Sequence, residues 1–231
     1  MSINPEQFAA ANKAAVDSLL SVANTALASA ERIATLNLET ARSVLEDSVA
    51  NTKALIDEKK VFALLAYYGS SPTTEAMDKV FGPAKVPLVG TISGAGSLRE
   101  VFGRNPNGRY MFNVRASYAD ETEAIVNQLV SIGIKNIAVF YQNDAYGKAG
   151  LEGVQRALKE LNLETAAVGT VERNSTDVAL ALKDIMAVKP EAIVQIGAYK
   201  ACATFIRLAR QQGYAGNFYN VSFVGTQALM D

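Results

Sequence analysis

The chain has 231 residues, of which 49% are hydrophobic and 19% are charged, and its formal net charge is −1 at pH 7. This composition is enough for a sizeable core, and the balanced charge gives no electrostatic reason to expect binding to nucleic acid. The sequence contains no histidine, which excludes the commonest catalytic base and zinc ligand, and the single cysteine, Cys202, excludes an intrachain disulfide.

We expect no secretory leader at the start of this sequence. Residues 1–7 have neither the basic region nor the apolar region of such a signal. The longest apolar run, Val61 to Tyr68, is too short to span a bilayer. We therefore expect the chain as given to remain in the cytoplasm.

Residues 4 to about 58 are predicted to form one long helix. Asn4 as N-cap, Pro5 at the first helical position and Gln7 at capping-box spacing are a strong start signal. Apolar residues then recur at three- and four-residue steps, and no glycine occurs before Gly69. A single helix cannot bury its own apolar stripe, so we expect it to pack in a helix-mediated homo-oligomer, on a neighbouring domain or on an apolar surface.

Several stretches of this helix match a known family in their exact residues. Met1-Ser-Ile-Asn-Pro-Glu-Gln-Phe8, Ser29-Ala-Glu-Arg-Ile33 and Asp47-Ser-Val-Ala-Asn51 resemble the amino-terminal part of phasins, small helical proteins that coat polyhydroxyalkanoate granules. The resemblance covers residues 1–58 and implies a granule surface as partner. Phasins normally continue with more helix, whereas this pattern stops near Lys59.

From Val61 onward, short apolar runs alternate with helical patterns. The first run, Val61 to Tyr68, suits a strand buried on both faces of a sheet. Strands are expected at 61–68, 86–92, 110–114, 137–141, 166–171, 192–196 and 218–221, and helices at 71–80, 120–132, 148–161, 177–188 and 200–212, with another helix beginning at 226. This alternation predicts an α/β fold with a parallel sheet.

Such sheets bind ligands beyond the carboxyl ends of their strands. The residues there are Ser70-Ser71, Ser93 to Gly96, Asp144 to Tyr146, Ala198-Tyr199 and Ser222-Phe223. The Ser71 hydroxyl and the amides of Gly94 to Gly96 suit a carboxylate, while Tyr146 and Tyr199 can cover an apolar group or an ammonium. With one carboxylate, Asp144, and no metal cluster, this set favours binding over catalysis, and we expect no cofactor. Ordinary loop chemistry is the alternative interpretation.

Other motifs predict packing rather than chemistry. Gly94-Ala-Gly96 lacks the third glycine of a dinucleotide-binding fingerprint, because Arg99 stands at that position. Glycines at 147, 150 and 153 have helical spacing and indicate a helix face in close contact with a neighbour. Cys202 falls inside a predicted helix, where a buried, inert thiol is expected.

Three stretches, Tyr110 to Thr122, Ile137 to Gly147 and Phe218 to Gln227, resemble type I solute-binding proteins of ABC transporters, in particular the branched-chain amino-acid (leucine/isoleucine/valine) binding family. The resemblance spans nearly all of residues 61–231. It implies two periplasmic-binding-protein-like lobes with parallel sheets that close over a small ligand, an amino acid or related carboxylate, with a transporter permease as partner. The resembled family is periplasmic.

The resemblance also implies domain bounds and pocket positions. A phasin-like segment (1–60) precedes an incomplete first lobe (61–118) and a second lobe (119–231). The implied ligand-binding residues are Ser71, Gly94 and Gly96 in the first lobe and Tyr146, Tyr199 and Ser222 in the second. Ser222 stands where the leucine-type pocket has an acidic residue for the ligand's ammonium. The sequence thus predicts a truncated, non-enzymatic binding protein fused to a helix. A phasin-like granule or oligomerisation protein and a histidine-free α/β enzyme are the alternatives.

Overall fold

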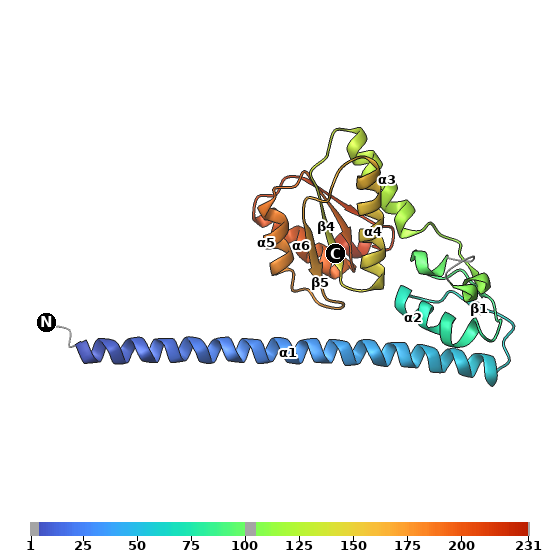
Figure 1. Ribbon diagram of the computed structural model, residues 1–231, viewed down its shortest axis with the longest axis horizontal. Coiled ribbons are helices and arrows are strands. Elements are labelled where there is room, and N and C mark those ends of the chain that lie inside the picture. The colour runs from blue at the N-terminus through green and yellow to red at the C-terminus, as the bar shows by residue number, and fades with distance from the viewer. Residues whose placement is uncertain (1–4, 100–104, 231) are drawn as a thin grey trace. The chain divides into compact units, whose positions relative to one another are not determined.

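The computed structural model describes residues 5–99 and 105–230 (Figure 1). The chain divides into two compact units, Met1–Glu46 and Asp47–Asp231.

The first unit consists of helix α1 (Pro5–Asp57), whose last turns extend into the second unit. The helix is 53 residues long, which confirms the single uninterrupted helix expected from the lack of glycine. Several of its large apolar side chains are exposed, among them Leu19, Leu20, Val22 and Leu36. Neither α1 nor any other helix in the described part of the chain combines the length and hydropathy that a membrane span needs.

The last turns of α1 pack on the α/β part of the second unit. Thr52 is buried, and its hydroxyl lies 2.8 Å from the Tyr67 phenol oxygen. The same phenol donates to the Ser48 carbonyl at 3.0 Å, and Ile56 packs against the hydrophobic core. These contacts attach the end of α1 to the segment that follows strand β1.

The second unit holds two parallel sheets. In the smaller sheet the order is β1-β2-β3, formed by β1 (Leu64–Leu65), β2 (Leu88–Val89) and β3 (Met111–Phe112). The larger sheet has the order β5-β4-β6-β7, formed by β4 (Ile137–Gln142), β5 (Val168–Val171), β6 (Ala192–Ile196) and β7 (Asn217–Asn220). Both sheets confirm the predicted parallel α/β architecture.

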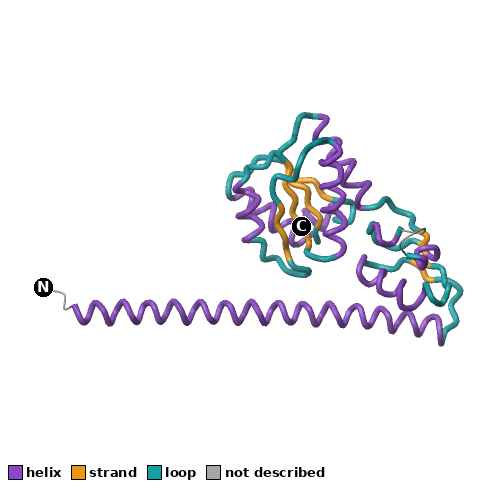
Figure 2. Tube along the Cα trace, viewed as in Figure 1, coloured by secondary structure: helices purple, strands orange, loops and turns teal. Residues whose placement is uncertain are grey.

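Helices connect the strands and cover the larger sheet (Figure 2). They are α3 (Tyr118–Ser131), α4 (Ala145–Glu160), α5 (Ala179–Ala187), α6 (Tyr199–Gln211) and the short α7 (Thr226–Met230). Next to the smaller sheet, α2 (Ser70–Ala76) continues into a π-helical turn (Met77–Phe81), and two 3₁₀ turns span Gly96–Leu98 and Pro106–Tyr110.

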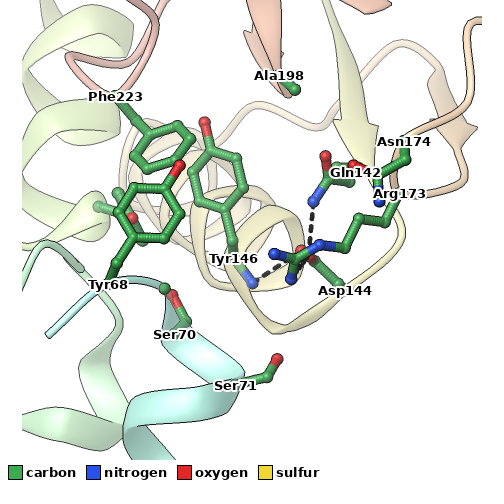
Figure 3. A pocket seen from close by; sticks show the side chains of 12 residues that line it. Tyr68, Ser70, Ser71, Gln142, Asp144, Tyr146, Arg173, Asn174, Ala198 and Phe223 are labelled. Carbon is green, nitrogen blue, oxygen red and sulfur yellow. Dashed lines mark hydrogen bonds and ion pairs between the residues drawn. The ribbon is translucent and has the colours of Figure 1, made fainter. Parts of the chain in front are cut away.

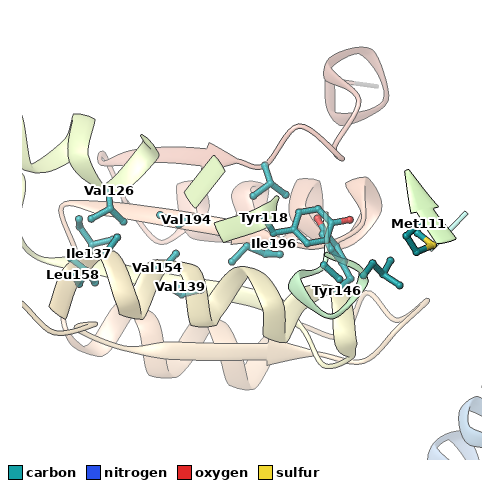
Figure 4. Close-up of a cluster of buried hydrophobic side chains, with 14 of the residues drawn as sticks. Met111, Tyr118, Val126, Ile137, Val139, Tyr146, Val154, Leu158, Val194 and Ile196 are labelled. Carbon is teal, nitrogen blue, oxygen red and sulfur yellow. The ribbon is translucent and has the colours of Figure 1, made fainter. Parts of the chain in front are cut away.

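The core lies on both faces of the larger sheet. On one face, Val126 of α3 and Val154 and Leu158 of α4 join Val139 and Val194 of the sheet (Figure 4). On the other face the Phe140 and Phe205 rings stack with centroids 4.4 Å apart, beside the buried Cys202. Burial on both sides explains why the sequences of β4 and β6 are nearly continuous apolar runs, with Gln142 and Gln195 as their polar members.

The prediction for the first strand is wrong in length and burial. Only Leu64 and Leu65 form β1, and Leu65 is 74% exposed instead of buried. Ala66 adopts a positive φ of 54°, which interrupts the extended backbone. Among the described residues, one face of the smaller sheet stays uncovered, with Val89 and Phe112 exposed beside Leu65.

Two helices begin earlier than expected because of their caps. Helix α4 starts at Ala145 rather than Lys148, since the Asp144 carboxylate accepts hydrogen bonds from the N–H groups of Tyr146 and Gly147. Helix α3 starts at Tyr118, where Ser117 and Asp120 form a reciprocal capping box. The cap of α4 places Asp144 and Tyr146 after β4, and the cap of α3 places Tyr118 after β3.

The three helical glycines of α4 lie in close contact with their neighbours, as predicted. A Cβ atom at Gly147 would lie 1.9 Å from the Gln142 carbonyl oxygen, and one at Gly150 would lie 2.8 Å from the Ile196 side chain. At Gly153 it would lie 2.2 Å from the Thr122 hydroxyl. Glycine therefore lets α4 approach both the sheet and α3.

Candidate functional site

A cavity of about 100 Å³ lies at the carboxyl ends of strands from both sheets (Figure 3). Its lining residues follow β1, β3, β4, β5, β6 and β7, which is where a parallel sheet presents ligand-binding groups. They are Tyr68, Gly69, Ser70, Ser71, Tyr118, Gln142, Asp144, Tyr146, Arg173, Asn174, Ala198 and Phe223.

One end of the cavity is aromatic. The Tyr146 ring meets Phe223 at a centroid distance of 4.8 Å and Tyr118 at 4.9 Å, and Tyr68 lies 5.7 Å from Phe223. In Figure 3 the rings of Tyr68, Tyr146 and Phe223 are grouped together, apart from the charged side chains. Burial raises the pKa of Tyr146, so its phenol stays protonated and points to the Gly197 carbonyl 3.4 Å away. This end suits an apolar group of a ligand.

The other end of the cavity is polar and charged. Asp144 accepts a hydrogen bond from the Gln142 amide at 2.6 Å, and its Oδ2 lies 3.7 Å from Nη1 of Arg173. Because the same carboxylate caps α4, helix formation fixes its position. Figure 3 shows Arg173 reaching toward Asp144 from the segment after β5.

Two serines line the cavity between these ends. The Ser70 hydroxyl is paired with that of Ser93 at 2.8 Å. The Ser71 hydroxyl has no hydrogen-bond partner within residues 5–99 and 105–230. Of the two, Ser71 has its hydroxyl available to a ligand.

The structure brings together two of the six residues implied by the sequence. Ser71 and Tyr146 line the same cavity. Tyr199 is 42% exposed as the first residue of α6, and the preceding residue, Ala198, lines the cavity instead. A ligand-binding role for Tyr199 stays a prediction.

The two glycines of the set lie outside the lining. The Gly94 carbonyl accepts the Tyr118 N–H at 2.8 Å, and a Cβ atom at Gly94 would lie 2.8 Å from the Tyr118 ring. Gly94 thus supports a lining residue by close contact. Gly96 opens a 3₁₀ turn, and a Cβ atom there would meet nothing within 4 Å among the described atoms.

Ser222 belongs to a separate polar cluster beside the cavity. Its backbone N–H donates to Glu121 at 2.7 Å and its hydroxyl donates to the same carboxylate at 2.9 Å. Nη2 of Arg115 lies 2.8 Å from Glu121 and also donates to the Ser222 hydroxyl. The cluster therefore holds the loop in which the next residue, Phe223, lines the cavity.

Sequence reasoning missed six lining residues: Tyr68, Gly69, Tyr118, Gln142, Arg173 and Asn174. Arg173 and Asn174 follow β5 within three residues, so the same strand-end rule could have found them. Tyr68 is the last residue of the strand expected at 61–68. Gln142 directly follows the strand expected at 137–141, so the same rule could have found it, and Tyr118 lies between the strand expected at 110–114 and the helix expected at 120–132. In the described part of the chain, no group of three or more His, Cys, Asp and Glu side chains is arranged to hold a metal.

Comparison with solved structures supports the fold. A possible leucine/isoleucine/valine-binding protein from Rhodopirellula baltica SH 1 aligns with 80% of this chain at 32% identity and a TM-score of 0.70, covering 50% of its own length. A substrate-binding periplasmic protein from Ralstonia solanacearum aligns with 80% of this chain at 29% identity and a TM-score of 0.71, covering 51% of its own length.

A more distant structure shares the fold. The branched-chain amino acid ABC transporter protein from Thermus thermophilus, solved with bound valine, aligns with 84% of this chain at 19% identity and a TM-score of 0.69. It is covered over 47% of its length. The chain thus spans about half the length of these solved structures.

A family comparison covers nearly the whole sequence. The model of the periplasmic binding protein family matches residues 6–230. Together with the parallel sheets and the cavity at their carboxyl ends, this match identifies the fold as that of type I periplasmic binding proteins. The chain belongs to the periplasmic binding protein family.

Proposed function

We propose that this chain binds a small amino acid or related carboxylate without converting it, as the solute-binding part of an ABC transporter. The ligand lies in the cavity between two lobes, 61–118 and 119–231. The observation that carries the proposal is the cavity itself, where aromatic rings and free polar groups converge from the strand ends of both sheets. The relative at 32% identity, described as a possible leucine/isoleucine/valine-binding protein, supports this ligand class.

The size of the cavity implies that it opens to admit a ligand. At about 100 Å³ it is smaller than the roughly 150 Å³ cavity that holds benzene in another protein. The chain passes once from the lobe at 61–118 to the lobe at 119–231, and two lobes joined in this way can separate by hinge motion, as other binding proteins do. Binding would then close the aromatic residues of one lobe over groups of the other.

Calorimetry on the intact chain tests the proposal with a panel of amino acids and carboxylic acids. Tyr146→Ala should weaken binding of the best ligand at least tenfold, whereas Tyr146→Phe should retain most of the affinity because the ring remains. Tyr214→Ala is the matched control, since Tyr214 lies outside the cavity lining and packs on Phe218. If no panel member binds the unaltered chain, the proposal is wrong. An unchanged affinity in Tyr146→Ala would reject this pocket as the site.

We also propose that α1 docks on an apolar surface, either a granule surface or another helix. The observation that favours it is the exposure of apolar side chains on α1. The resemblance of residues 1–58 to phasins, proposed from the sequence, makes the granule surface the first one to test. A fluorescent reporter on the full chain should concentrate at polyester granules, and Leu20→Asp with Leu36→Asp should disperse it. Leu180→Asp, at an exposed position of α5, is the control. Diffuse fluorescence of the unaltered chain together with a monomeric sedimentation profile would reject the proposal.

A further inference from the structure

The charged end of the cavity has one acidic and one basic side chain. Among the described lining residues, Asp144 is the only carboxylate and Arg173 the only cation. Glu121, the partly buried acid nearby in the fold, lies outside the lining and is bound to Arg115 and Ser222. Whether the cavity binds an anionic or a cationic group therefore depends on how many hydrogen-bonding positions of Asp144 and Arg173 the protein itself already uses.

The Asp144 carboxylate is largely occupied by the protein. Its Oδ1 accepts the N–H groups of Tyr146 at 3.0 Å and Gly147 at 3.1 Å, and its Oδ2 accepts the Gln142 amide at 2.6 Å. An ionised carboxylate offers about four acceptor positions, so about one remains. That position faces Arg173.

Arg173 is engaged much less. Nη1 is 3.7 Å from Asp144, which is an ion-pair distance but too long for a hydrogen bond. Its side chain is 40% exposed and carries five N–H donors in a planar fork. A ligand carboxylate can therefore take a bidentate contact with Arg173 while Asp144 keeps its role as helix cap.

An ammonium group is disfavoured at the same end. It would have to displace Arg173 from the last acceptor position of Asp144 and lie beside another cation. It would also lie near the amino-terminal end of the 16-residue helix α4, where the helix dipole favours negative charge. Both effects favour an anion at this end.

We propose that the cavity recognises its ligand through a carboxylate held by Arg173 and needs no ammonium group on the ligand. The rings of Tyr68, Tyr146 and Phe223 cover a small apolar body, and the free Ser71 hydroxyl adds a hydrogen bond. The ligand class is a short monocarboxylic acid. This inference rests on the proposed binding function and narrows its ligand class.

Matched ligand sets test this inference by calorimetry on the intact chain. The first set is 3-methylbutanoate, valine and 2-methylpropan-1-amine, and the second is 3-phenylpropanoate, phenylalanine and 2-phenylethylamine. Each set keeps the apolar body and changes only the charged groups. We expect at least one acid to bind as tightly as its amino acid or more tightly, and neither amine to bind. An amino acid that binds tenfold more tightly than its acid, or an amine that binds through the faces of the aromatic rings, would overturn the inference.

Variants of Arg173 give a second test. Arg173→Gln should weaken binding of the acid at least tenfold, and Arg173→Lys should weaken it less because the charge remains. Arg156→Gln is the control, since Arg156 forms an exposed pair with Glu123 away from the cavity. Thermal melting checks that each variant is folded. A folded Arg173→Gln variant with unchanged affinity would overturn the inference.

The outcomes separate the two proposals. Binding of amino acids but not of the corresponding acids leaves the proposed function standing and rejects only the carboxylate inference. If the unaltered chain binds an amino acid of the wider panel but no compound of either set, only the carboxylate inference is rejected, and if it binds no member of the panel at all, both are rejected. If Arg173→Gln still binds an acid and Tyr146→Ala does not, the cavity is the binding site but Arg173 does not hold the carboxylate.

Discussion

Glu121 accepts two hydrogen bonds from Ser222, one from its backbone N–H at 2.7 Å and one from its hydroxyl at 2.9 Å, across a sequence separation of 101 residues. Arg115 completes the cluster from the segment before α3. The first turn of α3 and the loop after β7 are thereby joined next to the cavity. Because Phe223 follows Ser222 and lines the cavity, this cluster helps to set the position of one aromatic wall.

Removing the Glu121 carboxylate should destabilise the fold. Glu121→Gln breaks an ion pair of low exposure and weakens two hydrogen bonds, so we expect a loss of about 1–3 kcal/mol in the free energy of unfolding. Urea denaturation measures it. Glu123→Gln is the control on the same helix, because its pair with Arg156 is exposed and should contribute less than about 0.5 kcal/mol. Equal effects of the two substitutions would contradict this role of the cluster.

Glycine is required at position 147 and not at position 96. A Cβ atom at Gly147 would lie 1.9 Å from the Gln142 carbonyl oxygen, so Gly147→Ala should cost about 3 kcal/mol or more of folding stability. A Cβ atom at Gly96 would meet no described atom within 4 Å, so Gly96→Ala should change stability by less than about 0.5 kcal/mol. Chemical denaturation compares the two. Two equally stable variants would show that α4 can move away from β4.

Cys202 should resist thiol reagents in the folded protein. Burial raises the pKa of its thiol to about 12, so at pH 8 only about 10⁻⁴ of the molecules carry the reactive thiolate. In urea the thiol regains a pKa of about 8.5, and labelling should become fast. Since the sequence has one cysteine, the labelling rate reports this site alone. Fast labelling of the native protein would show that α6 opens readily.

The capping box of α3 should make stability depend on pH. The hydrogen bond with the Ser117 side chain, and then that with its backbone, lowers the pKa of Asp120 below its usual range. A lowered pKa means that Asp120 stabilises the fold above its unfolded pKa of about 3.9 and loses this effect as the pH falls through the folded value. Asp120→Asn should therefore be less stable than the unaltered protein at pH 7, and this difference in the free energy of unfolding should shrink as the pH falls.

Urea denaturation between pH 7 and pH 3 measures the difference in the free energy of unfolding between Asp120→Asn and the unaltered protein. Ser117→Ala removes the other half of the box and should cost about 1 kcal/mol at pH 7. Asp184→Asn, on the exposed side of α5, serves as a matched carboxylate control. A gap between Asp120→Asn and the unaltered protein that does not narrow in acid would argue against the capping role.

The order of elements could be read from the sequence because it depends on local signals. The absence of glycine before Gly69 predicted the long helix, and the apolar runs at 137–141 and 192–196 predicted the central strands. Errors arose where distant groups decide the outcome. Leu65 was expected to be buried, yet its burial depends on what packs against the outer face of the smaller sheet.

The sequence by itself determined the α/β order, the long first helix and the kinds of side chain that stand at strand ends. Only the tertiary structure decided which of them meet. Ala198 lines the cavity while its neighbour Tyr199 faces solvent, and Arg173 joins Asp144 from a different strand end. The physical reason is that helix and strand formation depend on neighbours in the chain, whereas a pocket depends on how strands far apart in sequence pair in register and where each helix cap turns the backbone.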